Sequence, residues 1–329
     1  MKASRPISAF AALSFLVQTT VAAPPTLDAI APPGGKAGSE VAVTLVGKYE
    51  PWPCQLHFSE PGFQFVPDPE KKGTGKLKIP GGFKKNAVLI RSHNSEGVSE
   101  PVIFAVGNTK EIQDDEKDEN KVTKAASLDP ASFPLVINGR LQKRDELDGW
   151  KLSLNKDQTV FAYVDAYSLR SPVDPVLHVY DVKGNRIEMQ HDGPVNLDSR
   201  LRFTAPEKGD YIIAIVGFAH PAAATIHYVG SDKIVYRIHF ANEEKQFPGH
   251  FIPKDIGKDH SDAKAPLPFK LGGTLTKPLQ KNSVIVTAKK GDSWWVQADA
   301  YSLGFPTDPV LAIYNAEGKS IREVDDVKP

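Results

Sequence analysis

The chain has 329 residues, which is long enough for two or three domains of ordinary size. Its 40 basic and 40 acidic side chains give a net charge of zero, so the composition offers no basis for binding nucleic acid or an anionic membrane. A single cysteine excludes an intramolecular disulfide, and frequent proline (27) and glycine (25) with only 2 methionines favour short strands and turns over a helical enzyme core.

The N-terminus has the three parts of a secretory signal. Lys2 and Arg5 precede an apolar run from Ile7 to Val17, and small residues follow up to Ala22. We predict that residues 1–22 are a signal peptide and that the protein is exported, either to the periplasm or out of the cell. The apolar run is shorter than the roughly 20 residues that span a bilayer, and no later run is longer, so we predict no integral membrane segment.

Residues 23–107 alternate short β-type runs with turns. In Ser39–Gly47, the period of two places Val41, Val43 and Leu45 on one face of a strand. This pattern predicts a small β-sandwich. The segments "PTLDAIAPPGGKAGSEVAVTLVG" and "GVSEPVIFAV" resemble the first strands and the last hairpin of the IPT/TIG family of immunoglobulin-like domains, and the resemblance implies an Ig-like fold.

Two charged or Pro/Gly-rich stretches, residues 108–132 and 242–265, are predicted to be solvated linkers. The first contains an acidic cluster, and carboxylate oxygens in such a cluster suit a hard cation such as calcium as the alternative. Its acidic residues are Glu111, Asp114, Asp115, Glu116, Asp118 and Glu119.

An internal repeat dominates the rest of the chain. A shift of 134 residues aligns Pro134–Asp192 with the downstream sequence without a gap, and eleven of the sixteen residues of Asp165–Tyr180 are identical to those of Asp299–Tyr314. The repeat predicts a duplicated domain, over residues 133–241 and 266–329. The second copy has no counterpart of the last strands expected in the first, so we expect either a truncated version of a longer protein or a copy that a partner strand completes.

Alternation assigns the faces of the repeated strand. Val160, Ala162 and Val164 form an apolar core face, and Phe161 and Tyr163 alternate with them on the other face. Phe161 and Tyr163, with Trp295 of the second copy, offer an aromatic platform for a sugar or peptide. Packing under a neighbouring loop is the alternative.

Comparison of the two copies separates candidate site residues from the rest. His178 aligns with Ala312, and Asp181 with Asn315, so neither position suits a shared catalytic or metal role. The acidic residues present in both copies are Asp165, Asp174 and Asp192 in the first and Asp299, Asp308 and Asp326 in the second. These six residues either fix turns and strand ends or bind calcium at one end of each sandwich.

The first copy resembles the bacterial pre-peptidase C-terminal domain, a β-sandwich appended to secreted proteases and other exported proteins. The matching elements are Gly139, Asp145, Asp148, Trp150, Asp174–Leu177, Gly209 and Tyr211. The family's double aspartate before glycine is His191-Asp192-Gly193 here and Asp325-Asp326-Val327 in the second copy, so each copy departs at one position. The resemblance implies a jelly-roll-like sandwich and, as in related collagenase domains, calcium binding and help in engaging substrate.

No catalytic signature is found: there is no His-Glu-x-x-His pair, no Gly-x-Ser-x-Gly elbow and no phosphate loop. The set Ser168, His178 and Asp165 loses its base in the second copy. We therefore predict an all-β, non-enzymatic, exported binding or spacer protein, the N-terminal part of a larger secreted protein, with an unknown protein or polysaccharide ligand. The alternative is the non-catalytic portion of a secreted peptidase or other hydrolase whose catalytic domain lies beyond Pro329.

Overall fold

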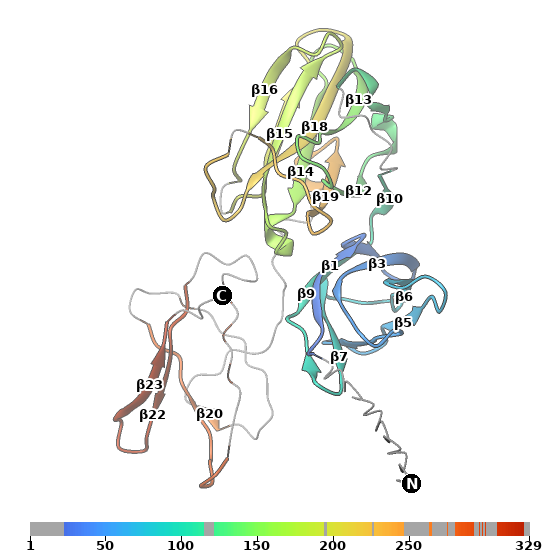
Figure 1. The fold of residues 1–329 in the computed structure, drawn as a ribbon. Helices are drawn as coiled ribbons and strands as arrows, with labels where there is room; N and C mark the ends of the chain where they lie inside the picture. The colour runs from blue at the N-terminus through green and yellow to red at the C-terminus, as the bar shows by residue number, and fades with distance from the viewer. Residues whose placement is uncertain are drawn as a thin grey trace, which may run out of the picture.

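The computed structural model describes residues 23–114, 122–193, 196–225, 227–246, 263–264, 280–292 and 308–325, with the single residues 275, 296, 298 and 300. The predicted signal peptide lies outside these residues. The described chain is all-β, as the sequence predicts, and its only helices are short 3-10 turns (Figure 1). Among the described residues, no helix is long and apolar enough to cross a membrane.

The first sandwich has two sheets whose apolar faces meet in one core. One sheet has the order β1 (Thr26–Ala31), β3 (Glu40–Lys48), β6 (Thr74–Lys78), β5 (Gln64–Pro67). The other has the order β2 (Gly34–Lys36), β9 (Val102–Gly107), β7 (Ala87–Asn94), β4 (Gln55–Phe58), with β8 (Gly97–Val98) paired to β7. Val43 and Leu45 of β3 are buried in this core and Val41 packs against it, which confirms the face predicted from their alternation.

The second sandwich has two five-stranded sheets. The first sheet has the order β10 (Lys110–Gln113), β12 (Leu135–Arg140), β19 (Val235–Ala241), β14 (Thr159–Asp165), β17 (Arg200–Thr204). The second has the order β11 (Ala126–Ser127), β13 (Asp148–Leu154), β18 (Gly209–Ala219), β15 (Val173–Asp181), β16 (Arg186–Gln190). The short 3-10 turns are η1 (Val122–Lys124), η2 (Pro130–Ser132), η3 (Tyr167–Leu169) and η4 (Glu244–Gln246). Val160, Ala162 and Val164 are fully buried in the core, so the core face predicted for β14 is confirmed.

The predicted linker 108–132 contributes strands to both sheets of the second sandwich. β10 pairs in parallel with β12, and β11 pairs in parallel with β13. The solvated linker predicted from charge density is therefore wrong at both of these segments, because each covers a sheet edge that would otherwise expose unpaired backbone groups. Residues 115–121 lie outside the described part.

One hairpin of the second copy repeats a hairpin of the first. β22 (Leu311–Tyr314) and β23 (Ser320–Val324) pair antiparallel, with the same partners and the same bulge, 134 residues on, as β15 and β16. Asp181 and Asn315 each accept a turn amide through Oδ1, which explains why either residue serves at this position. Two further short strands, β20 (Ala263–Lys264) and β21 (Val284–Ile285), pair in parallel.

A buried joint connects the first two sandwiches. The guanidinium of Arg237 on β19 lies 2.5 Å from the carboxylate of Glu111 on β10, and the two side chains are only 4% and 8% exposed. The amide of Asn138 donates to Glu111, and its oxygen accepts from Arg237 Nε at 3.2 Å. Gly34 of the first sandwich lies against this guanidinium, where a Cβ would clash. The ion pair itself lies within the second sandwich, and its guanidinium packs against Gly34 of the first.

Apolar packing completes the joint. Leu169 of η3 packs with Ala87, Ile103 and Ala105 of the first sandwich, and Val235 packs with apolar residues of β1. In Figure 1 the two sandwiches lie end to end, with β10 and β12 next to β1 and β3. The contacts hold these two domains in one relative orientation.

Candidate metal centre

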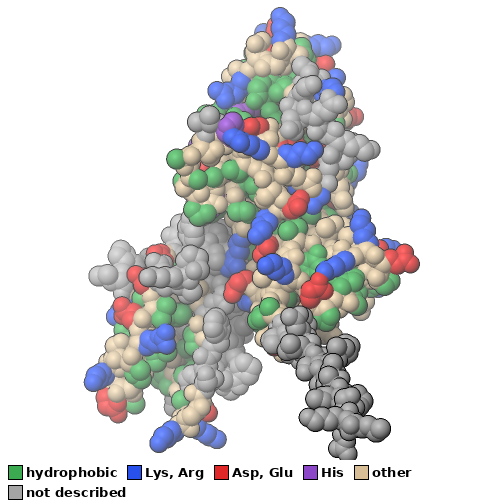
Figure 2. Space-filling view, viewed as in Figure 1, with side chains coloured by type: hydrophobic (Ala, Val, Ile, Leu, Met, Phe, Trp, Pro, Cys, Tyr) green, Lys and Arg blue, Asp and Glu red, His purple; other side chains and the backbone are tan. Residues whose placement is uncertain are grey.

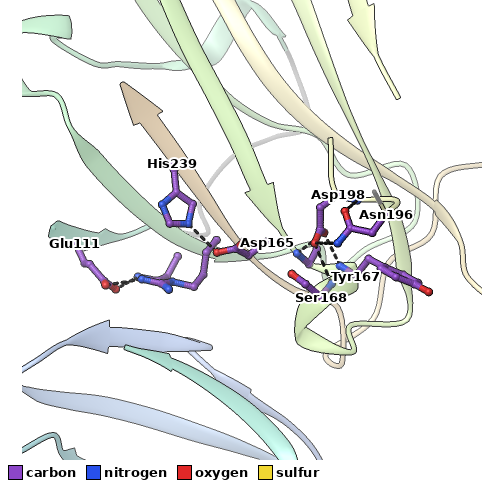
Figure 3. A network of polar contacts seen from close by, with 10 residues as sticks. Glu111, Asp165, Tyr167, Ser168, Asn196, Asp198 and His239 are labelled. Carbon is purple, nitrogen blue, oxygen red and sulfur yellow. Dashed lines mark hydrogen bonds and ion pairs between the residues drawn. The ribbon is translucent and has the colours of Figure 1, made fainter. Parts of the chain in front are cut away.

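Asp165, one of the predicted calcium ligands, belongs to a buried ion pair instead. It ends β14 and lies opposite Arg237 in the register with β19. Its Oδ2 lies 2.8 Å from Nε2 of His239 (Figure 3). Burial raises the pKa of the Asp165 carboxyl, but the charges of His239 and Arg237 outweigh burial and lower it. The structure therefore separates Asp165 from the other predicted ligands.

Asp198 is a structural residue that the sequence analysis missed. Its carboxylate accepts the backbone amides of Ala166, Tyr167 and Ser168, which fixes the turn between β14 and β15 (Figure 3). Burial and the charge of Asp165 raise the pKa of Asp198 to about 7, although the three amide donors favour its charged form. The position aligned with Asp198 falls outside the 329 residues, so comparison of the copies gave no signal here.

The other two predicted ligands do come together, with a third residue that the sequence analysis passed over. Asp174, His191 and Asp192, the Asp174 cluster, each offer a donor atom, and these atoms all lie within 4.8 Å of one another. His191 Nε2 is 3.1 Å from Asp174 Oδ2, and 4.0 Å from Asp192 Oδ1. Asp174 Oδ1 is buried and has no hydrogen-bond partner among the described residues. The carboxylate therefore keeps one oxygen available as an acceptor.

Local structure brings these residues to one end of the sheet. Asp174 is the second residue of β15, and His191 directly follows the end of β16, so the hairpin brings the two residues to the same end of the sheet. The hydroxyl of Ser199 lies between the carbonyl oxygens of Pro175 and His191 and ties the two segments together. Phe218 lies opposite Asp174 in the sheet, and its ring meets the His191 ring edge-on at 5.7 Å. The cluster therefore has one apolar side and one open to solvent.

The charges of the Asp174 cluster suit a bound cation. Burial raises the pKa of the Asp174 carboxyl, the charge of His191 lowers it, and the charge of Asp192 raises it again. A divalent cation would offset the charges of the two carboxylates, and the imidazole of His191 would offer it a nitrogen ligand. An imidazole nitrogen is an ordinary ligand for zinc, whereas calcium takes oxygen ligands.

The predicted aromatic platform is wrong for Tyr163. This side chain points away from the core, as predicted, but it is fully buried. Arg200 lies over the ring at 4.8 Å from its centroid, and the His239 ring lies 5.3 Å away. Phe161 is partly exposed, and Trp295 lies outside the described residues. Tyr163 is therefore part of the buried polar layer, where no ligand ring reaches it.

Two of the second copy's predicted ligands, Asp299 and Asp326, also lie outside the described residues, while Asp308 is exposed. The Ser168, His178 and Asp165 set is not assembled. His178 Nδ1 bonds the hydroxyl of Tyr180 at 2.7 Å, while Asp165 bonds His239 on the other sheet. No proton relay connects these three residues.

A cavity of about 610 Å³ lies between the first two sandwiches. One side is the outer face of β3, β5 and β6, and the other is formed by the ends of β10 and β12. Its charged lining residues are Asp68, Lys71, Lys76, Asp114 and Arg140. The lining has both signs of charge, as does the face of the molecule shown in Figure 2, where basic and acidic side chains are interspersed.

Comparisons with known proteins give no family. No protein-family model matches the chain, and a search of curated proteins found no match. Among solved structures, the pre-peptidase C-terminal domain of a collagenase from Bacillus anthracis is 11% identical, with a TM-score of 0.26, over 36% of this chain and 94% of that one.

Two further structures show similarities of the same order. The periplasmic inhibitor of g-type lysozyme from Aeromonas hydrophila is 12% identical, with a TM-score of 0.23, over 40% of this chain and 96% of that one. The mixed-linkage glucan-utilisation protein SGBP-B of Bacteroides ovatus is 8% identical, with a TM-score of 0.19, over 63% of this chain and 71% of that one. At these values the similarities assign neither a family nor a function.

Proposed function

We propose that the protein is an exported, non-catalytic binding and spacer protein, and that its second sandwich binds a divalent cation at the Asp174 cluster. The cluster carries the proposal: three donor side chains converge within 4.8 Å, and one buried carboxylate oxygen has no partner in the part of the chain that the structure describes. The joint between the first two sandwiches supports the spacer role, because apolar contacts and the packing of Arg237 against Gly34 connect them. The partner is proposed to be a protein or a polysaccharide.

The cation proposed for the first copy is zinc or a similar borderline metal, because His191 supplies nitrogen. The aligned residues of the second copy are Asp308, Asp325 and Asp326, which are all carboxylates. Oxygen donors suit calcium, so calcium remains the proposal for the second copy. One substitution, His191→Asp, turns the donor set of the first copy into that of the second.

The test is calorimetric titration of the chelator-treated full chain with zinc and with calcium. We expect His191→Ala to weaken zinc binding at least about tenfold, since it removes one of three ligands, and His191→Asp to exchange zinc affinity for calcium affinity. Asp181→Asn is the control, because Asp181 lies in an exposed turn outside the cluster. Zinc binding that is absent, or that His191→Ala leaves unchanged, refutes the proposed site.

A further inference from the structure

One short segment of the second sandwich connects the Asp174 cluster with the joint. Residues 191–193 form one end of this segment and supply His191 and Asp192 to the cluster. Residues 196–199 form its other end, where Asp198 accepts three backbone amides at η3 and so caps that turn (Figure 3). Two candidate ligands and the cap of a joint element therefore lie in one stretch of chain.

Hydrogen bonds tie the two ends of this segment together. The hydroxyl of Ser199 reaches the carbonyl oxygen of His191. The amide of Gly193 donates to the carbonyl of Asn196 at 3.0 Å, and the Asn196 side chain donates to Asp198 Oδ2 at 3.3 Å. Ser199 and Asp198 are both 0% exposed, so these polar groups cannot turn to water instead. A shift at the ligand end therefore costs hydrogen bonds at the end that caps η3.

The turn that Asp198 caps is also the turn that docks on the first sandwich. Leu169 of η3 is only 5% exposed, because it packs with apolar residues of β7 and β9. Arg170, the next residue, donates from Nη1 to the carbonyl of Pro101 at 3.3 Å. One side of η3 is thus held by Asp198, and the other side is held by the first sandwich.

From these contacts we propose that cation binding at the Asp174 cluster and docking of the first sandwich are coupled through residues 196–199. The coupling rests on the proposed cation site and adds a form of regulation to it. A bound cation fixes His191 and Asp192, which lowers the entropy cost of ordering the segment that caps η3. Docking orders η3 and so lowers the cost of assembling the ligands. Because such coupling is reciprocal, each event strengthens the other by the same factor, and the cation controls how stiffly the first two sandwiches are joined.

The test is calorimetric titration of the chelator-treated full chain with zinc, with substitutions in the joint and none in the cluster. Leu169→Asp removes the apolar contact between η3 and the first sandwich, and we expect it to weaken zinc binding at least about fivefold. Val98→Asp is the matched control, since it places the same charge at a position of the first sandwich that is 53% exposed. We expect this control to leave the zinc affinity unchanged.

Two further variants separate coupling from general destabilisation. Arg170 has a φ of 64°, which glycine adopts without strain, so Arg170→Gly removes the hydrogen bond to Pro101 and relieves the backbone at the same time. Coupling predicts weaker zinc binding in this variant, whereas a stability effect alone predicts unchanged or tighter binding. Ser199→Ala breaks the connection itself, so adding Leu169→Asp to it should weaken zinc binding no further.

Two results overturn the coupling and leave the cation site standing. The first is equal zinc affinity in Leu169→Asp, Arg170→Gly and the unsubstituted chain. The second is a loss in Leu169→Asp that is just as large in the presence of Ser199→Ala, since the effect then reaches the cluster by another route. A full chain that binds no zinc at all refutes the cation site and the coupling together.

Discussion

Glu111→Gln is predicted to destabilise the protein strongly, although the change keeps the shape of the side chain. The Glu111–Arg237 pair is almost completely buried, so the substitution removes the carboxylate bonded to the guanidinium and leaves Asp165 as its remaining counter-charge. Breaking a buried pair from one side costs about 3–5 kcal/mol. Asn138 still accepts from Arg237 Nε, so we expect the lower end of that range, about 3 kcal/mol.

The assay is urea unfolding, with a triple variant to separate charge from packing. Glu111→Leu, Asn138→Leu and Arg237→Met together replace the polar groups by apolar ones, and we expect the triple variant to cost much less than Glu111→Gln alone, about 1 kcal/mol or less. Lys76→Gln is the surface control, because its pair with Glu40 is more than half exposed, and it should cost under about 0.5 kcal/mol. A loss below about 1 kcal/mol for Glu111→Gln would refute the cost assigned to the buried ion pair.

Three further predictions concern single residues. Burial lowers the pKa of His178 to about 4, against 6.5 for a free side chain, so the unfolded chain binds more protons at this residue between these values. The contribution of His178 to the free energy of unfolding should therefore fall by about 3 kcal/mol from pH 7 to pH 4, while Asp198, whose pKa is raised to about 7, contributes in the opposite direction. In urea titrations at the two pH values, the change in the free energy of unfolding should thus differ by about 3 kcal/mol between His178→Gln and the unsubstituted chain, with the variant losing less stability at pH 4. Asp198→Ala leaves three buried or partly buried amides without an acceptor and should cost about 3 kcal/mol or more in thermal or urea unfolding, whereas Asp181→Ala in an exposed turn should cost about 1 kcal/mol; equal losses would contradict the capping role. Gly34→Ala places a methyl group 2.7 Å from the joint's guanidinium and should cost about 1–3 kcal/mol, while Gly81→Ala, with no contact closer than 4.0 Å, should be near neutral by the same measurement.

Alternation along a strand predicted the core of both sandwiches because it depends only on neighbouring residues. Val43 and Leu45, and the series that starts at Val160, are buried as their period of two requires. The same pattern placed Tyr163 and Asp165 on the opposite face, which is correct, but it could not show that this face is covered. Burial of an outer face depends on contacts far away in sequence.

Charge composition gave a wrong prediction of a solvated linker for the same reason. Glu111 lies in a charge-dense segment that looks solvated, but its partner Arg237 is 126 residues away. Likewise, Asp165 forms a hydrogen bond with His239, which is 74 residues away in the sequence. Local composition carries no information about a partner that only the sheet register brings near. The pairing of β14 with β19 and of β10 with β12 decides which charges meet.

Comparison of the copies found two of the three residues of the candidate metal centre. Asp174 and Asp192 were found because both copies have aspartate there. His191 was not among the predicted ligands because it aligns with Asp325, and only acidic residues present in both copies were candidates. Histidine and aspartate are both metal ligands, so the exchange changes the preferred metal and keeps the site. A test for shared ligand chemistry would have found this position, where a test for identity did not.

Contacts at the joint account for two positions at which the sequence of the first copy differs from that of the second. Asn138 and Arg170 both contact the joint, and both align with glycine, Gly272 and Gly304. Arg170 has a φ of 64°, a conformation that glycine adopts without strain and that costs arginine about 1 kcal/mol. In the first copy, the guanidinium of Arg170 donates a hydrogen bond to the carbonyl of Pro101 in the first sandwich. The strain is therefore offset by docking, and a copy with glycine at both positions cannot make the same joint.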